Sequence, residues 1–149
     1  MKKYQYIVYR YGAEILVSPG MEQSKNYIQH GNTSIYEHSF STALMCLLIS
    51  RGLRLIVDER VLVRGALLHD YFLYDWHVKE PDHNWHGFTH PDRALKNSKR
   101  DFSISEVEAD MIARHMFPLT LKPPFYKESG ILCGADKVCS IREILHRKG

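Results

Sequence analysis

The strongest constraint on the fold is a nearly continuous apolar run at residues 61–72 that contains the ionisable pair His69-Asp70. Asp58 lies just before the run, where its carboxylate can accept hydrogen bonds from the first free N–H groups of a helix. A helix that is apolar on most of its sides needs other elements to cover it. The run therefore predicts a central helix that the rest of the chain buries.

Further helices are indicated by capping residues, prolines and helical spacing. Ser34-Ile-Tyr-Glu37 and Ser103-Ile-Ser-Glu106 are both capping-box patterns, which open helices. Pro91 favours a helix start, with His90 at or beside the N-cap. Besides the central helix, the predicted helices cover about residues 35–50, 91–100, 104–117 and 129–146.

The remaining segments are less regular. Residues 75–89 are crowded with Trp, His, Asp, Pro and Gly, which predicts an irregular loop. Residues 4–9 fit either a strand or a helix, and Ser18-Pro19-Gly20 predicts a turn. No internal repeat or linker divides the chain. We therefore expect an all-α fold, a single domain over residues 1–149 built as a bundle of five or more helices.

Charge and composition exclude several classes of protein. The 20 Lys and Arg residues and 17 Asp and Glu residues are mixed along the chain, so a nucleic-acid partner is not expected. Apolar stretches such as residues 43–49 are far shorter than the ~20 residues that span a bilayer, and no signal peptide is recognisable. The three cysteines contain no C-x-x-C pair, which argues against a disulfide framework and a Cys-type zinc site. We expect a cytoplasmic protein without a membrane partner.

Ligand-type side chains recur on the apolar faces of the predicted helices. Asp70 has mostly apolar neighbours three and four positions away, where a buried and unpaired carboxylate costs several kcal/mol. His38, His115 and Asp136 have similar surroundings. One such histidine alone usually bonds a backbone carbonyl, and one such aspartate can pair with a nearby lysine. Their joint occurrence, with His69 beside Asp70, favours a divalent metal in the core.

The histidine content supports this interpretation. The chain has nine histidines, of which five lie within residues 69–90: His69, His77, His83, His86 and His90. With His90 included, the six candidate metal ligands are His38, His69, Asp70, His90, His115 and Asp136. They suffice for one or two ions, two being about 3.5–4 Å apart with Asp70 as the bridge. Their N and O atoms suit Mn, Fe, Co, Zn or Mg.

The order His38, His69-Asp70, Asp136 resembles the H…HD…D signature of the HD-domain metal-dependent phosphohydrolase superfamily. The resemblance covers residues 29–140 and leaves residues 1–28 as an N-terminal extension. It implies an all-helical bundle of the HD-domain type. It also implies that a metal-activated water hydrolyses a small phosphorylated substrate, a phosphate ester or a nucleotide.

In members of that superfamily with two metals, a further histidine opens the helix after the loop and another precedes the last aspartate. His90 and His115 are similar to these two. No GYP motif follows His115, which argues against the superfamily's cyclic dinucleotide phosphodiesterases.

Three residues are candidates for the chemistry itself. Asp70 can orient the attacking water, and Lys137, next to a predicted ligand, can bind a phosphoryl oxygen. His86, at the edge of the predicted loop, can act as a ligand, donate a proton to the leaving group, or do neither. Asp75 and His77 can support the ligands or act as proton donors.

Other functions stay open at this stage. Some proteins that resemble this superfamily hold a di-iron pair in the same ligand frame and activate oxygen. A non-catalytic domain can use such a pocket to sense a nucleotide, although a sensor has no need of two metals. A homo-oligomer also stays open, because four tyrosines can cover either the core or a neighbouring subunit: Tyr4, Tyr6, Tyr9 and Tyr11.

Overall fold

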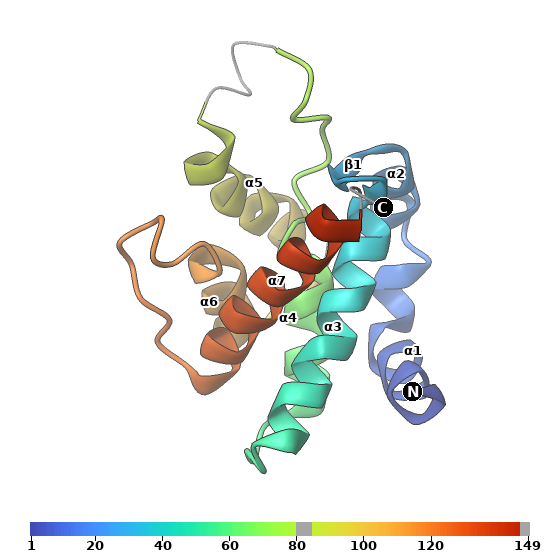
Figure 1. Ribbon diagram of the computed structural model, residues 1–149, viewed down its shortest axis with the longest axis vertical. Coiled ribbons are helices and arrows are strands. Elements are labelled where there is room, and N and C mark those ends of the chain that lie inside the picture. The colour runs from blue at the N-terminus through green and yellow to red at the C-terminus, as the bar shows by residue number, and fades with distance from the viewer. Residues whose placement is uncertain (80–84, 147–149) are drawn as a thin grey trace.

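The computed structural model describes residues 1–79 and 85–146. Within them, seven helices pack into a bundle, joined by a short 3-10 helix and a two-stranded hairpin (Figure 1). The elements are α1 (Lys2–Leu16), α2 (Pro19–Gln23), η1 (Ser24–Asn26), β1 (Ile28–His30), β2 (Thr33–Ser34), α3 (Ile35–Gly52), α4 (Glu59–Leu68), α5 (His86–Asp101), α6 (Glu106–Arg114) and α7 (Lys127–His146). The predicted all-α bundle of five or more helices is confirmed.

Helix α4 is the central element, as the apolar run predicts. It packs against α1, α3 and α6. Asp58 caps it by accepting a hydrogen bond from the Val61 N–H at 3.1 Å. The side chains that it buries completely include Leu62, Val63, Ala66, Leu67 and Leu68.

Helix α4 ends at Leu68, so the prediction of a helix to residue 72 is wrong. His69 is the C-cap, and the Phe72 N–H then donates to the Asp70 carbonyl at 2.8 Å, which turns the chain. Tyr71 packs in the main core and Phe72 in a second apolar cluster. Hydrophobicity continues through the turn because both sides of it are buried, and the apolar run therefore overestimates the length of the helix.

The N-terminal segment is helical. Residues 4–9 lie in α1, which decides between the two alternatives in favour of a helix. The predicted turn at Ser18-Pro19-Gly20 is wrong, because Ser18 is the N-cap of α2 and its Oγ accepts from the Met21 N–H at 3.2 Å. Proline is favoured both in turns and at the first position of a helix, so the tripeptide fits either structure.

The hairpin β1–β2 is not predicted by the sequence. Its strands are antiparallel, with His30 opposite Thr33. Gly31 has a φ of 60°, a conformation that glycine adopts without steric cost. The hairpin leads directly into Ser34, the N-cap of α3, and packs against α3 and α7. It thereby brings Gln29 and His30 to the end of the bundle at which α3 begins.

Helices α3 and α7 match their predictions closely. Ser34 Oγ accepts from the Glu37 N–H at 3.2 Å, and Glu37 Oε2 accepts from the Ser34 N–H at 2.9 Å, so the first capping box is confirmed. Helix α3 continues to Gly52, and α7 begins at Lys127, slightly before the predicted start at residue 129.

The second capping box lies two residues later than predicted, at Ser105 and Glu108 instead of residues 103 and 106. The buried guanidinium of Arg64 accounts for this position. It donates to the Ser103 carbonyl at 2.9 Å and pairs with Glu108 at 2.8 Å. The sequence contains the Ser-x-x-Glu pattern twice, at residues 103–106 and 105–108, and the buried charge of Arg64 favours the later one.

Helix α5 begins at His86, so the predicted start at Pro91 is wrong. A proline removes the hydrogen bond to the carbonyl four residues earlier, here that of Gly87, and the first turns of the helix form without it. The predicted loop at residues 75–89 is correspondingly shorter. Its residues 80–84, with His83, lie outside the described residues.

Surface and cysteine features complete the description. Tyr4 and Tyr11 pack against the core, whereas Tyr6 and Tyr9 are exposed. All three cysteines are free and buried. In the described part of the chain, no helix has both the length and the apolar character that crossing a bilayer requires.

Candidate metal centre

Six buried ionisable side chains from five helical segments converge beside the end of α4. They are His38 of α3, His69 and Asp70 just after α4, His90 of α5, His115 just after α6, and Asp136 of α7. None is more than 7% exposed. The structure thus brings together all six residues that the sequence predicts as metal ligands.

The first group of potential ligand atoms comes from His38, His69, Asp70 and Asp136, and these atoms lie within 4.8 Å of one another. Asp136 Oδ1 is 3.0 Å from His38 Nε2 and 3.6 Å from His69 Nε2. Asp70 Oδ2 is 3.6 Å and 3.3 Å from the same two nitrogens. Two imidazole nitrogens and two carboxylates therefore face a common point.

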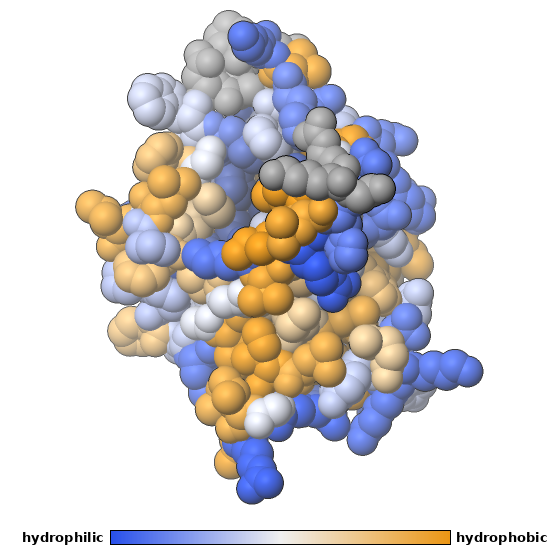
Figure 2. All heavy atoms as spheres, viewed as in Figure 1, coloured by the Kyte–Doolittle hydropathy of each residue, from blue (hydrophilic) through white to orange (hydrophobic). Residues whose placement is uncertain are grey.

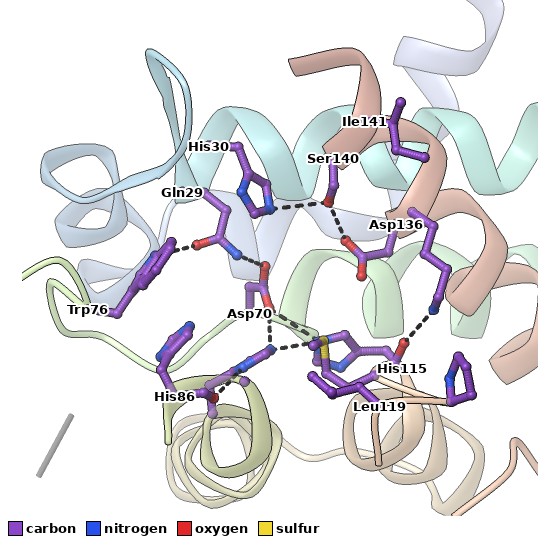
Figure 3. A pocket seen from close by; sticks show the side chains of 15 residues that line it. Gln29, His30, Asp70, Trp76, His86, His115, Leu119, Asp136, Ser140 and Ile141 are labelled. Atoms are coloured by element: carbon purple, nitrogen blue, oxygen red, sulfur yellow. Dashed lines mark hydrogen bonds and ion pairs between the residues drawn. The ribbon is translucent and has the colours of Figure 1, made fainter. Parts of the chain in front are cut away.

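The second group comprises Asp70, His90 and His115. Asp70 Oδ1 lies 3.2 Å from His90 Nε2 and 3.3 Å from His115 Nε2 (Figure 3). Because Oδ2 faces the first group and Oδ1 the second, the Asp70 carboxylate is shared between them. This is the bridging position that the sequence predicts for Asp70.

The imidazoles of His69, His90 and His115 all direct Nε2 at the cluster. In each of them Nδ1 lies beside a backbone carbonyl, which can only accept, so Nδ1 donates to it and Nε2 is the nitrogen left to face a metal. The partners are Ala66 O for His69 at 2.6 Å, His86 O for His90 at 2.8 Å and Ile112 O for His115 at 2.8 Å.

These Nε2 atoms fit a cation. His90 Nε2 and His115 Nε2 are 2.9 Å apart, so two lone pairs face each other unless a positive charge lies between them. His69 Nε2 and Asp70 Oδ1 are buried without a hydrogen-bond partner. Buried polar atoms of this kind are costly, and imidazole nitrogen with carboxylate oxygen is the donor set of many divalent metals.

The carboxylates are held in their charged form. Burial raises the pKa of Asp70, but the neighbouring His69 and the close imidazoles of His115 and His90 hold it well below its ordinary value. The hydrogen bond from His38 and the nearby His69 likewise overcome burial and lower the pKa of Asp136. Burial lowers the pKa of His38, but hydrogen bonds to Asp136 and Glu143 dominate and raise it to about 9. The cluster therefore attracts positive charge, whether protons or a metal.

A second layer of contacts that sequence reasoning missed fixes the carboxylate of Asp70. Gln29 Nε2 donates to Asp70 Oδ2 at 2.5 Å, and Trp76 Nε1 donates to Gln29 Oε1 at 3.1 Å. No sequence signal marks Gln29, because the hairpin that positions it was not predicted.

Two further missed contacts come from α7. Ser140 Oγ donates to Asp136 Oδ1 at 3.3 Å, and Glu143 lies 2.9 Å from Nδ1 of His38. Ser140 and Glu143 follow Asp136 by four and seven residues, which places all three on one face of the helix. That spacing is a signal from which both residues could have been predicted.

Lys137 lies at the cavity beside the cluster. Its ammonium donates to the Cys133 carbonyl at 3.2 Å and the His115 carbonyl at 3.4 Å, and it lies 3.0 Å from the Cys133 Sγ. These contacts hold one positive charge at the cavity.

His86 also lines the cavity but belongs to neither group of ligand atoms. Its ring stacks between those of Trp76, at 4.9 Å, and His90, at 4.5 Å. Its Nδ1 lies 2.6 Å from the hydroxyl oxygen of Tyr74. The contacts are those of a residue beside the ligands rather than of a ligand.

Asp75 and His77 contact each other at 3.3 Å and are not among the residues that line the cavity. His83, the remaining histidine of the cluster noted in the sequence, lies outside the described residues.

A cavity of about 760 Å³ opens beside the cluster (Figure 3). Two kinds of residue line it. The ionisable and polar ones are Gln29, His30, Asp70, His86, His90, His115, Asp136, Lys137 and Ser140, and the others are Trp76, Gly87, Met116, Pro118, Leu119 and Ile141. The volume is within the 300–1,000 Å³ that is typical of small-molecule sites.

Comparison with known proteins agrees with this geometry. The family model of the HD domain matches residues 35–141, a span that includes all six predicted ligands. No curated protein and no solved structure matches the chain.

Proposed function

The chain belongs to the HD domain family, which includes metal-dependent phosphohydrolases, and from this premise we propose that it is itself such an enzyme. In this proposal the cavity binds a small phosphate ester or nucleotide beside one or two divalent ions. The observation that carries the proposal is the buried carboxylate of Asp70, which offers one oxygen to each of two groups of imidazole Nε2 atoms.

If these residues held a divalent ion, it would lower the pKa of a water beside it and offset negative charge on phosphoryl oxygens. The orientation of the ligand side chains is fixed by the protein itself. The Nδ1 protons of His69 and His115 are committed to backbone carbonyls, so Nε2 of each ring stays free for coordination. Asp70, held by Gln29, orients the attacking water as well as the metal.

Lys137 and His86 have the other two proposed roles. Lys137 places an ammonium at the cavity, where it binds a non-bridging phosphoryl oxygen and stabilises charge that develops there. His86 lies at the cavity, with its ring fixed by the stacks on Trp76 and His90, and donates a proton to the leaving group.

The test is a screen of nucleotides and phosphate esters with the protein loaded in turn with Mn, Fe, Co, Zn and Mg. Release of phosphate, or of the phosphorylated fragment, is measured for the natural chain and for two variants. Asp70→Asn removes the shared carboxylate, and we expect it to lower the rate at least about a hundredfold. Asp92→Asn changes an exposed carboxylate of α5 that is in neither ligand group, and its rate should equal that of the natural chain.

Two results contradict the proposal. Equal activity of the two variants would show that the hydrolysis does not use this site. Inertness towards every phosphate compound, together with a tightly held iron pair and oxygen consumption, would favour the di-iron oxygenase instead.

A further inference from the structure

The cavity beside the predicted metal ligands is lined by two unlike kinds of residue. The polar kind comprises the ligands together with Gln29, His30 and Ser140. The apolar kind lies around them, with Trp76, Leu119 and Ile141 at separate places about Asp70 (Figure 3). A phosphate fits the polar residues, because its oxygens need metal ions and hydrogen-bond donors. The apolar residues offer neither, and they must contact a different part of the substrate.

Positive charge is scarce in this cavity. Lys137 is the only lysine or arginine among the described residues that line it. Its ammonium is already held by the carbonyls of Cys133 and His115. Proteins bind chains of phosphates with several charged or backbone donors, since each phosphate adds negative charge. One phosphate is balanced by the predicted metal site and Lys137, whereas a triphosphate or diphosphate leaves oxygens without partners.

Part of the apolar lining reaches the surface of the molecule. Leu119 is 49% exposed and Ile141 is 59% exposed, although both line the cavity. Figure 2 shows apolar residues gathered on this face on both sides of a hollow that has hydrophilic residues inside it. A ligand that covers these side chains removes apolar area from water, and each buried CH₂ group strengthens binding about fourfold.

The size of the cavity indicates how large the apolar part is. A volume of about 760 Å³ is far more than one phosphate occupies, and it matches a ligand of drug-like size. Gly87 of α5 approaches the Leu119 side chain so closely that a Cβ there would lie 3.2 Å from Leu119 Cδ2. Gly87 and Leu119 therefore lie close together in the wall of the cavity.

We propose that the substrate is a phosphate monoester of an uncharged, largely apolar organic group, bound with its phosphate at the metal ligands and its organic part against Trp76, Leu119 and Ile141. This inference rests on the proposed phosphohydrolase function and narrows its substrate class. It excludes nucleoside diphosphates and triphosphates as the preferred ligands.

Alkylphosphonates test the inference by binding alone, because their P–C bond is not hydrolysed. Methyl-, butyl- and octylphosphonate are titrated into the metal-loaded protein, with AMP and ADP as polar comparisons, and dissociation constants are measured by calorimetry. We expect affinity to increase about twofold to fourfold with each added CH₂ group, and octylphosphonate to bind more tightly than AMP or ADP.

Matched variants locate the apolar contact. Ile141→Ser and Ile144→Ser both change exposed isoleucines of α7, but only residue 141 lines the cavity. Ile141→Ser should weaken octylphosphonate about tenfold and methylphosphonate less than twofold, and Leu119→Ser should behave in the same way. Ile144→Ser should leave both affinities unchanged, and all three variants should keep the metal content of the natural chain.

The outcomes separate this inference from the proposed function. Equal affinity along the phosphonate series, tighter binding of ADP than of octylphosphonate, or no effect of Ile141→Ser and Leu119→Ser would overturn the substrate class even if phosphate esters are hydrolysed. Conversely, the expected phosphonate series without hydrolysis of any phosphate ester would contradict the proposed function while the ligand class stands.

Discussion

Asp70 is the residue on which both groups of potential ligand atoms depend. Its two carboxylate oxygens face different sets of imidazoles, while His115 belongs to one group alone. We therefore expect Asp70→Ala to lose metal at both positions and His115→Ala to lose metal at the second position alone. Metal content after dialysis, measured by mass spectrometry, distinguishes the two. Full metal content in Asp70→Ala would show that other residues are the ligands.

The protonation of His38 makes the stability of the metal-free protein depend on pH. Burial lowers its pKa, but hydrogen bonds to Asp136 and Glu143 raise it from 6.5 to about 9. A pKa that is higher in the folded state contributes stability that is complete below pH ~6.5 and is lost as the pH rises through about 9. The lowered pKa values of Asp70 and Asp136 act in the opposite direction, and their contribution is lost in acid.

We accordingly predict that the free energy of unfolding of the metal-free protein falls by roughly 2 kcal/mol between pH ~6.5 and pH ~9. Urea titrations across this range measure it. In His38→Gln the alkaline fall should be much smaller, with the remainder due to His69, whose pKa is also raised because its carboxylate neighbours outweigh its burial. A natural chain whose stability is constant from pH 6 to pH 10 would contradict this account.

At the scale of the elements, close packing of α4 against α6 depends on Gly65. A Cβ at residue 65 would lie 2.6 Å from Met111 Cε and closer still to its Sδ, and Met111 is fully buried. Gly65→Ala should therefore reduce the free energy of unfolding by about 1–3 kcal/mol. Gly134→Ala is the matched control, because nothing lies within 4 Å of a Cβ at that exposed position of α7.

The control variant should gain about 0.5–1 kcal/mol, since alanine restricts the unfolded chain more than glycine does. Chemical denaturation of both variants is the measurement. Equal effects of the two substitutions would mean that α4 and α6 are not as close as the structure places them.

The boundaries of the elements show what the sequence can and cannot predict. The capping box at Ser34 and Glu37 uses contacts between near neighbours in the chain, and its prediction is confirmed. The start of α5 is predicted at Pro91 but lies at His86. A proline fits the first turn of a helix, and here it also fits the second turn, so it does not fix where the helix begins. The end of α4 at Leu68 is missed since the residues after it are equally buried, and burial by distant elements is not encoded in local hydrophobicity.

The candidate ligands were easier to predict than the residues that support them. Asp70 and His38 stand out in the sequence because ionisable side chains are rare on apolar helical faces. Gln29 reaches Asp70 from a hairpin 41 residues earlier in the chain, and no periodicity connects the two. Such a contact follows from the path of the chain, which the sequence alone did not determine.

At the scale of the whole molecule, metal binding links helices that are distant in the chain. The six predicted ligands come from α3, α5, α7 and the ends of α4 and α6. A ligand that binds the folded state alone stabilises it by about 4 kcal/mol at a thousand times its dissociation constant. We predict that saturating metal raises the melting temperature by about 10 °C and that chelation reverses the increase.

Thermal unfolding followed by circular dichroism measures this effect. Asp70→Ala is the control, and its melting temperature should not respond to metal. A natural chain that melts at the same temperature with metal and with chelator would contradict a site built from five helical segments.

Helices α4 and α6 both end one residue before a predicted ligand, so that His69 and His115 are their C-caps. The aligned peptide dipoles of a helix place about half an elementary negative charge at its C-terminus. The two helices therefore add the partial charge of their backbones to the same place that the aspartates occupy. No side-chain substitution removes this contribution, which means that the main chain itself draws cations towards the end of the bundle where the ligands meet.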